Sequence, residues 1–243
     1  FDSLVKAPFC AAYQKGQTPN PCVFCNAEIK FSALRAFADA KDIPFIATGH
    51  YARLSEENGQ KVFAKSGDVK KDQTYFLSQV PPSILPRLLL PLGDFSKDEI
   101  RKKAAEAGLS AAEKADSQEI CFVPENDYIS FLEGTMKVAP KEGKILDENG
   151  YMVGIHEGIH RYTIGQRKGL GAFGKKVFVT AIHPEENTVT IGDNAALFSK
   201  GLVAENVNAF LPIEGEVSVK IRSAAPCTDA TCRAAGTRAH ITF

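Results

Sequence analysis

The sequence has no excess of charge of either sign and no long hydrophobic run. Its 29 basic and 29 acidic residues give a formal net charge of zero, so a nucleic acid or an anionic membrane would have to be met by a local patch. No apolar run approaches the roughly 20 residues that a membrane helix needs, and we expect no membrane partner. The balance of 44% hydrophobic against 24% charged residues is that of a packed globular protein, which excludes disorder, collagen and coiled coil.

The two ends of the chain lack the usual start and stop signals. Residues 1–6 contain neither an initiator Met nor the basic stretch and cleavage site of a signal peptide, so the predicted location is cytoplasmic. Residues 1–14 have the pattern of the end of a helix, and residues 238–243 alternate like a strand that stops without a turn. These features predict that the chain is part of a longer protein.

The first half of the chain mixes helix and strand signals. Asn26 is expected to cap a helix, and the apolar stretch over residues 43–48 is typical of a buried strand that ends at Gly49 and His50. The predicted inward positions of the helix are Ile29, Ala33, Leu34 and Phe37. This helix–strand step predicts an α/β sheet.

A second helix is marked by a capping box. Ser96 and Glu99 have the S-x-x-E spacing, and the helix is expected to run through Ala107 to a stop at Gly108. Between the two helices, prolines within residues 81–91 interrupt a leucine-rich run. Because proline breaks regular structure, we expect an irregular buried crossing there.

From about Pro140 the hydrophobic pattern changes to the period of two that is typical of strands. The expected strands cover residues 144–146, 151–153, 177–182, 188–191, 203–210 and 216–222. Short antiparallel strands at this spacing suggest a small barrel. We place domain boundaries near Pro124 and Gly174.

The sharpest local feature is the C-x-x-C pair formed by Cys22 and Cys25, behind two prolines that stiffen a turn. A helix is expected to start there, and its unpaired N–H groups and dipole stabilise a thiolate. A redox pair, structural zinc, cluster ligation and coincidence would each explain the pair. A zinc site needs four ligands, and Cys227 and Cys232 have the wrong spacing to supply a second knuckle.

Three further places carry polar chemistry. Cys121 follows the polar residues 116–119, so it is either a functional thiol in a loop or a buried small hydrophobe. His50 lies where ligands of open α/β sheets bind, with a structural histidine as the alternative. Residues 71–76 contain more polar groups than a helix start requires, which favours a functional role. The alternative is that Asp72 is a simple helix cap.

Residues 151–176 form a local basic patch. They contain five basic residues against one acidic residue, a net charge of +4, with two histidines and Tyr162 between them. Glycine, positive charge and aromatic rings together suit contact with an RNA backbone, and a solvated basic loop is the alternative. The G-x-G-x-x-G pattern over residues 169–174 precedes a strand instead of a helix, so we reject it as a dinucleotide site.

Six motifs follow one another along the chain: TPNPCVFCNAEIKF (18–31), ATGHYAR (47–53), KDQTYFL (71–77), PLGDFSKDEIR (91–101), DSQEICF (116–122) and YTIGQRKGLG (162–171). In order and spacing they resemble the tRNA-specific 2-thiouridylases (MnmA/TrmU family) over essentially the whole chain. The resemblance implies an enzyme that uses ATP with Mg²⁺ to replace the C2 oxygen of the wobble uridine in the tRNA anticodon arm by sulfur. A sulfur donor such as a cysteine desulfurase or a sulfur-relay protein is implied as a partner.

The resemblance also implies a fold class and a domain division. Residues 1–124 would be the C-terminal part of an α/β PP-loop ATP-pyrophosphatase domain, residues 125–173 a small central domain that contacts tRNA, and residues 174–243 an incomplete C-terminal antiparallel β-barrel. The S-G-G-x-D-S signature of the PP-loop is absent and would lie before Phe1. We therefore expect this fragment alone to be inactive.

Individual residues take their expected roles from the same resemblance. Cys121 matches the family's persulfide carrier, and Cys25 matches its partner cysteine, which can release the sulfur by forming a disulfide. Gly49 and His50 are expected at the rim of the ATP site. The expected tRNA-binding residues are Lys71, Asp72, Gln73, Arg161, Tyr162, Gln166, Arg167 and Lys168.

One position departs from the family pattern. Many members have an Asp three residues before the cysteine that Cys25 matches. This chain has Cys22 at that position, so the acid/base role of the Asp is lost. A thiolate at Cys22 could act as the base, or Cys22, Cys25 and Cys121 could together hold a [4Fe-4S] cluster with one open iron. The persulfide and the cluster mechanism both stand open at this point.

Two other classes of protein compete with this interpretation. The first is a non-catalytic RNA-binding module in which the cysteines are structural and residues 151–243 bind the RNA. The second is a thiol-disulfide oxidoreductase, which would leave Cys121 without a role and would need a thioredoxin-like order of elements that the sequence does not show.

Overall fold

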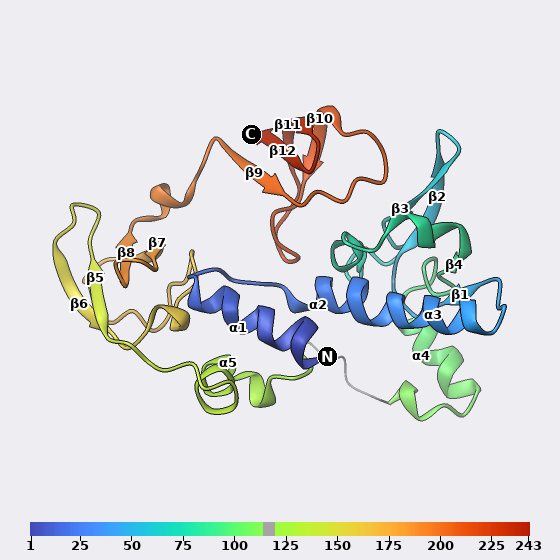
Figure 1. The fold of residues 1–243 in the computed structure, drawn as a ribbon, viewed down its shortest axis with the longest axis horizontal. Coiled ribbons are helices and arrows are strands. Elements are labelled where there is room, and N and C mark those ends of the chain that lie inside the picture. The colour runs from blue at the N-terminus through green and yellow to red at the C-terminus, as the bar shows by residue number, and fades with distance from the viewer. Residues whose placement is uncertain (114–119) are drawn as a thin grey trace. The chain divides into compact units, whose positions relative to one another are not determined.

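A computed structural model describes residues 1–113 and 120–243 of the chain (Figure 1). They divide into two compact units. The first unit contains residues 1–21 and 120–199, and the second contains residues 22–113 and 200–243. Each unit therefore combines two separate stretches of sequence, and the predicted domain ranges stay a prediction. No helix in the described stretches has the length and hydrophobicity to cross a membrane.

One continuous helical run extends from Pro21 to Ala40, and all of it except Pro21 belongs to the second unit. It consists of α2 (Pro21–Phe24), a π-helical stretch (Cys25–Phe31) and α3 (Ser32–Ala40). Pro21 occupies the first helical position, where its missing N–H costs nothing. The predicted cap at Asn26 is therefore wrong, because the helix begins five residues earlier and Asn26 lies inside it.

The inward face of this helical run also differs from the prediction. Phe31 and Ala38 are buried, whereas Leu34 is 36% and Phe37 is 60% exposed. The π-helical stretch closes its hydrogen bonds over five residues instead of four, so the residues that follow are rotated around the axis. A simple 3.6-residue period therefore misplaces the buried face.

A small parallel sheet lies beside the helical run. Its strands are β1 (Ile46–Ala47) and β4 (Leu88–Leu89), with Ile46 opposite Leu88. The predicted strand over residues 43–48 is thus confirmed at its centre only. The expected irregular crossing contains a 3-10 helix (Pro82–Arg87) followed directly by β4.

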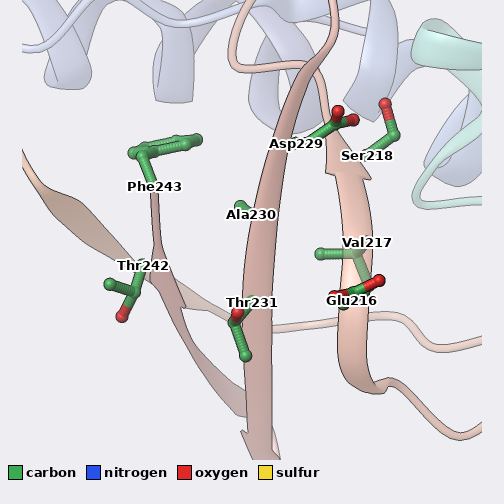
Figure 2. Close-up of a pocket in the computed structure, with 8 residues that line it drawn as sticks. All are labelled: Glu216, Val217, Ser218, Asp229, Ala230, Thr231, Thr242 and Phe243. Carbon is green, nitrogen blue, oxygen red and sulfur yellow. The ribbon is translucent and has the colours of Figure 1, made fainter.

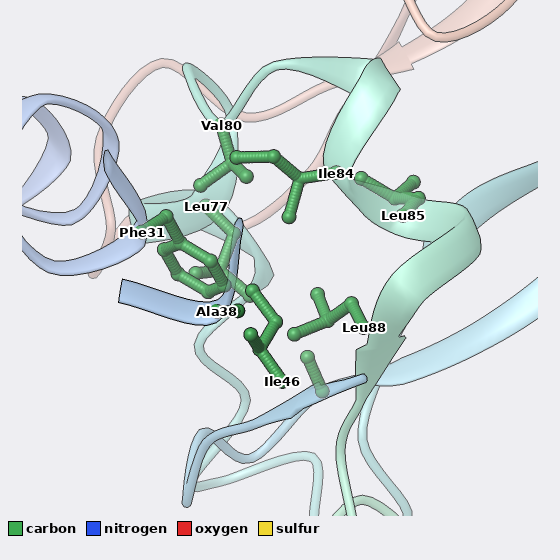
Figure 3. Packing of buried hydrophobic residues seen from close by; sticks show 9 residues of the cluster. Phe31, Ala38, Ile46, Leu77, Val80, Ile84, Leu85 and Leu88 are labelled. Atoms are coloured by element: carbon green, nitrogen blue, oxygen red, sulfur yellow. The ribbon is translucent and has the colours of Figure 1, made fainter. Parts of the chain in front are cut away.

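The hydrophobic core of the second unit joins the helical run to these two strands (Figure 3). Its fully buried members include Phe31, Leu77, Val80, Leu85 and Leu88. Leu77 and Val80 come from the segment that follows the predicted polar motif 71–76, in and just after a 3-10 helix (Thr74–Leu77). Packing of this segment against the helix places its polar residues near the helix start.

Two further elements complete this part of the second unit. The hairpin of β2 (Arg53–Glu57) and β3 (Gln60–Ala64), which the sequence analysis missed, turns at Asn58 and Gly59, both with positive φ. Helix α4 (Lys97–Glu106) begins with the predicted capping box: the Glu99 N–H donates to Ser96 Oγ at 3.3 Å, and the Ser96 N–H donates to Glu99 Oε2 at 2.8 Å. The capping box is confirmed.

The first unit contains helices and a four-stranded sheet, and each has a hydrophobic cluster of its own. A π-helical stretch (Asp2–Lys6) leads into α1 (Ala7–Gln14), and α5 (Tyr128–Ser130) leads into a second π-helical stretch (Phe131–Thr135). The strands are β5 (Gly143–Leu146), β6 (Met152–His156), β7 (Phe178–His183) and β8 (Thr188–Gly192), in the order β6-β5-β8-β7. Both predicted antiparallel pairs are confirmed, and β5 runs parallel to β8.

The last strands form a separate antiparallel sheet in the second unit. They are β9 (Gly201–Glu205), β10 (Glu214–Val219), β11 (Thr228–Ala235) and β12 (Arg238–Thr242), in the order β10-β11-β12-β9. The expected barrel is not found: among the residues that the structure describes, β9 and β10 stay at the sheet edges and nothing joins them. The remaining short 3-10 helices are Ser110–Ala112, Pro124–Asn126, Ile159–Arg161 and Asn194–Leu197.

Candidate functional site

The two motif cysteines lie on the first turns of the helical run of the second unit. Cys22 is the second helical residue, and Cys25 follows it three residues later. Residues at this spacing share one face of a helix, and both cysteines are half-buried. The prediction that the prolines deliver the pair to a helix start is confirmed.

Asn26, directly after Cys25, connects the helical run to two other segments. Its amide Nδ2 donates to the Phe76 carbonyl oxygen at 3.0 Å, and its Oδ1 lies 3.2 Å from His50 Nε2. Only 2% of Asn26 is exposed. The sequence analysis missed this residue as an anchor, although a polar residue on the inward side of a helix was the available signal.

His50 is held as a neutral imidazole. Because Asn26 uses its amide nitrogen on Phe76, its oxygen accepts, so His50 Nε2 carries the proton. The other ring nitrogen, Nδ1, lies 2.9 Å from Thr48 Oγ1 and accepts from it. Burial, with a smaller contribution from the positive charge of Lys30, lowers the pKa of His50 to about 4. The ring stacks on Phe31 at a centroid distance of 5.6 Å.

Gln73 and Asp72 of the polar motif 71–76 make hydrogen bonds within the second unit. Gln73 and Tyr51 are joined twice: the Gln73 N–H donates to the Tyr51 carbonyl, and the Tyr51 N–H donates to Gln73 Oε1, both at 2.8 Å. Both oxygens of Asp72 are engaged, one by the Ser66 N–H at 2.9 Å and the other by Thr74 Oγ1 at 2.6 Å. Asp72 therefore secures the loop locally, and its tRNA-binding role stays a prediction, as does that of Lys71 and Gln73.

Cys121 lies in the first unit and is exposed. The neighbouring Phe122 packs edge-on against Phe1 and Phe9, with ring centroids 5.6 Å and 5.3 Å away. The polar residues 116–119 that favoured a loop lie outside the described residues. The predicted approach of Cys121 to Cys25 joins the two units and stays a prediction.

Two other cysteines lie in and beside the last sheet of the second unit. Cys232 is buried in β11, and Cys227 is exposed in the loop before it. All six cysteines are free, so the predicted disulfide is not supported. No group of three metal-ligating side chains occurs among the described residues.

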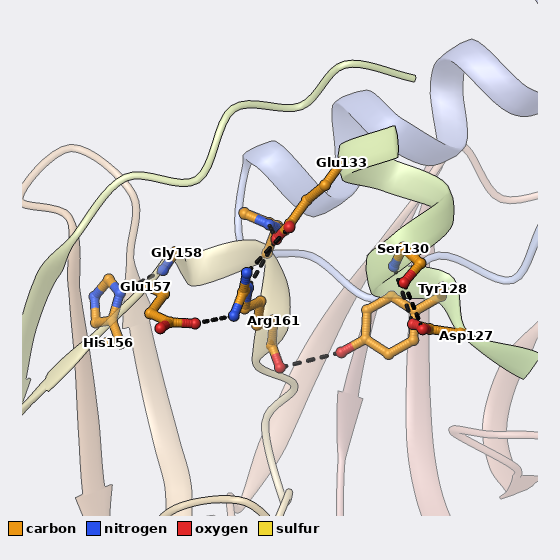
Figure 4. A network of polar contacts seen from close by, with 9 residues as sticks. Asp127, Tyr128, Ser130, Glu133, His156, Glu157, Gly158 and Arg161 are labelled. Carbon is orange, nitrogen blue, oxygen red and sulfur yellow. Dashed lines mark hydrogen bonds and ion pairs between the residues drawn. The ribbon is translucent and has the colours of Figure 1, made fainter. Parts of the chain in front are cut away.

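The basic patch of the first unit is partly neutralised from within (Figure 4). Arg161 donates from Nε to Glu133 Oε1 at 2.7 Å and from Nη2 to Glu133 Oε2 at 3.0 Å, and it also pairs with Glu157. His160 Nε2 donates to the same Glu133 Oε1 at 2.8 Å. Hydrogen bonds from Arg161 hold the pKa of Glu133 below its usual value. The sequence analysis missed Glu133, whose partners lie 27 and 28 residues away.

The loop that follows Arg161 keeps two basic side chains exposed. Gln166 fixes the loop, because its Oε1 accepts from the Thr163 N–H and its Nε2 donates to the Lys168 carbonyl, both at 3.0 Å. Arg167 and Lys168 are exposed on it. Thr18 Oγ1 donates to Thr163 Oγ1 at 3.1 Å, which ties the loop to the segment that leads into Cys22. The tRNA-binding roles of Arg161, Tyr162, Gln166, Arg167 and Lys168 stay predictions.

The second unit also contains two cavities that the motif cysteines Cys22 and Cys25 do not line. A cavity of about 670 Å³ lies on the strands β10, β11 and β12, where Glu216, Thr231 and Phe243 are among its lining residues (Figure 2). Another, of about 620 Å³, lies beside the β2–β3 hairpin and includes Arg53 and Lys61. No cysteine of the described residues lines either cavity.

Comparisons with known proteins agree with the sequence motifs. A family model described as the tRNA methyl transferase HUP domain matches residues 1–125, and one described as the tRNA methyl transferase PRC-barrel domain matches residues 129–193. An α/β domain followed by a β domain fits these matches. They cover most of the chain.

Several proteins called tRNA-specific 2-thiouridylase MnmA are similar to the chain. The protein of Clostridium acetobutylicum is 46% identical over 229 residues, which are 92% of this chain and 64% of that protein. The protein of Moorella thermoacetica is 46% identical over 251 residues, which cover 100% of this chain and 70% of that protein. The chain thus spans about two thirds of the length of these relatives.

Proposed function

This chain belongs to the family of tRNA-specific 2-thiouridylases, and we propose that the complete protein replaces the C2 oxygen of the wobble uridine in tRNA anticodons by sulfur. The observation that carries the proposal is the identity of 46% across 92% of the chain. The activity is assigned to the complete protein, because the chain spans only part of the relatives. Its proposed place of action is the cytoplasm.

The chemistry requires an activating group and a sulfur nucleophile. A uridine carbonyl oxygen is a poor leaving group, and ATP with Mg²⁺ would convert it to an adenylate with release of pyrophosphate. Gly49 and His50 follow β1 after one residue, Thr48, at the strand end where ligands of parallel sheets bind. We assign them to the rim of the ATP site. Because both ring nitrogens of His50 are engaged inside the protein, His50 shapes this rim and transfers no proton.

Sulfur would travel through two cysteines. A persulfide on Cys121 attacks C2 of the adenylated uridine with its terminal sulfur, and AMP leaves with the electron pair of the C2–O bond. The Cys25 thiolate then attacks the Cys121 Sγ. The S–S bond breaks, its electron pair stays on the sulfur bound to C2, and a Cys25–Cys121 disulfide forms. A dithiol reductant must reopen this disulfide, and a desulfurase or sulfur-relay protein must reload Cys121 in each turnover.

Cys22 has two alternative roles, as a ligand of an iron–sulfur cluster or as a base. A [4Fe-4S] cluster would need Cys22, Cys25 and Cys121 together as ligands, whereas the persulfide route needs only Cys25 and Cys121 for sulfur transfer. We therefore route no step through a cluster and assign Cys22 to the base position. Anaerobic purification of the complete protein with iron and sulfide analysis tests this choice, since an iron-free protein that thiolates tRNA eliminates the cluster.

The tRNA would be held mainly by the first unit. Arg167 and Lys168 are exposed on a loop fixed by Gln166, as phosphate contacts require. Arg161 is bound by Glu133 and Glu157, so we assign it a role in shaping this surface. Tyr162, Lys71, Asp72 and Gln73 complete the proposed tRNA contacts.

Nucleoside mass spectrometry of tRNA tests the proposal. The complete protein, given ATP, a sulfur donor and unmodified tRNA, should form 2-thiouridine at the wobble position. Cys121→Ser and Cys25→Ser should abolish the product, whereas Cys227→Ser, at an exposed cysteine with no assigned role, should retain it. A tRNA that is bound but unmodified would support the RNA-binding module instead, and a methylated nucleoside would support the activity named in the family models.

A further inference from the structure

The four residues of the C-x-x-C pair lie between buried Pro21 and buried Asn26. None of the residues 22–25 is buried, and Phe24 is 48% exposed. The first buried residues behind the turn are Asn26, 2% exposed, and Ala27, 7% exposed. The position of Cys25 in the second unit therefore depends on what holds the next residue along the helix.

The Asn26 side chain is held by two groups that come from different segments. Its Nδ2 donates to the Phe76 carbonyl, and its Oδ1 accepts from His50 Nε2. His50 is fixed in turn by the Thr48 hydroxyl and by stacking on Phe31. Because Asn26 is buried, water cannot easily replace either hydrogen bond when one is lost. The amide thus fixes the rotation of the helix start about its axis.

We propose that Asn26 is a positioning residue for Cys25, holding its thiol in the geometry that sulfur transfer needs. The proposal rests on the proposed role of Cys25. Misplacement of a reacting group by about 1 Å can slow a reaction on the order of 10²-fold. Asn26 itself contacts neither tRNA nor ATP in this assignment, so its loss should act on turnover and not on substrate binding.

The test compares Asn26→Ala with a matched control in the complete protein. Asn208 is an amide of the same unit that also makes two hydrogen bonds, to the Ser78 and Val80 carbonyls at 2.9 Å each, but it follows neither cysteine. In Asn26→Ala, kcat for thiolation should fall about 10- to 100-fold with KM for tRNA unchanged, and alkylation of Cys25 by iodoacetamide should change relative to Cys121. Asn208→Ala should show neither effect.

A second pair of variants serves if Asn26→Ala does not fold. His50→Gln keeps an N–H donor for Asn26, and His50→Leu removes it. The readout is alkylation of Cys25 alone, because His50 borders the proposed ATP site. One lost buried hydrogen bond shifts an equilibrium by about a factor of ten, so His50→Leu should change the alkylation rate about tenfold and His50→Gln should restore it.

Two results overturn the positioning role. One is a folded Asn26→Ala protein with wild-type kcat and Cys25 alkylation, and the other is a His50→Leu protein in which Cys25 is alkylated at the wild-type rate. Failure of the wild-type protein to thiolate tRNA would overturn the proposed function instead. In that case, the alkylation measurements still decide whether Asn26 positions Cys25.

Discussion

His50 should make the stability of the second unit depend on pH between its unfolded and folded pKa values. Burial lowers the pKa of this ring from 6.5 to about 4, so the folded state holds a neutral imidazole where the unfolded chain would bind a proton. The contribution is fully present above pH 6.5 and decreases as the pH falls toward 4. Protonation would also remove the hydrogen bond that His50 Nδ1 accepts from Thr48.

The size of the effect follows from the two pKa values. One pH unit of separation is worth about 1.4 kcal/mol, so acidification from pH 6.5 to 4 should remove roughly 3 kcal/mol of unfolding free energy through His50. This is a large part of the about 5–15 kcal/mol that stabilises a typical domain. Burial lowers the pKa of His156 as well, so this ring also favours the folded state less as the pH falls.

A comparison of wild type with His50→Gln isolates the contribution of this one ring. Urea denaturation at pH steps from about 7 to about 4, which span the two His50 pKa values, gives the free energy of unfolding of both proteins. The difference between them should change across this range, while NMR titration should leave the His50 ring neutral until about pH 4. A difference that stays constant, or a ring that titrates near 6.5, would refute the neutral-imidazole assignment.

Three further predictions concern changes of one or two residues. Gly93→Ala should prevent correct folding of the second unit, because the added Cβ would clash with the backbone carbonyl oxygen of Ala52; circular dichroism would check this. Ser96→Ala should lower the unfolding free energy by about 1 kcal/mol through loss of the helix cap, measured by urea denaturation. Replacing Arg167 and Lys168 together by Ala should weaken tRNA binding and reduce the salt dependence of the affinity by about one unit of slope per lost phosphate contact; unchanged binding in a filter assay would argue against this surface.

Local signals in the sequence were sufficient for some elements of the fold. The capping box of Ser96 and Glu99 predicted α4 because both of its hydrogen bonds lie within one turn. The hairpins of the first unit were predictable from strand period and turn residues for the same reason. The missed hairpin β2–β3 had an equally local signal, the Asn58–Gly59 pair at its turn.

Other features depend on contacts that the sequence does not reveal. Asn26 was a good cap by residue type, but Pro21 starts the helix earlier and tertiary partners at His50 and Phe76 use the amide instead. The exposure of Leu34 follows from the π-helical stretch, which no simple period predicts. Closure of a barrel depends on the pairing of edge strands, and strand pattern alone does not determine it.

The residues of the candidate site also separate into those with a local sequence signal and those fixed by distant contacts. The C-x-x-C turn was found from its motif, since spacing along a helix fixes which residues share a face. The neutral state of His50 and the pairing of Arg161 with Glu133 depend on burial and on partners far along the chain. Sequence patterns therefore located the candidate residues, and the structure identified the residues that hold them.

Transfer of labelled sulfur from Cys121 tests the central claim most directly. The complete protein carrying a ³⁴S persulfide on Cys121 would be mixed with ATP and unmodified tRNA, and both products would be analysed by mass spectrometry. We predict that the label appears in 2-thiouridine at the wobble position while Cys121 and Cys25 become joined in a disulfide. Label that stays on Cys121, or 2-thiouridine that forms without it, would contradict the sulfur-transfer account.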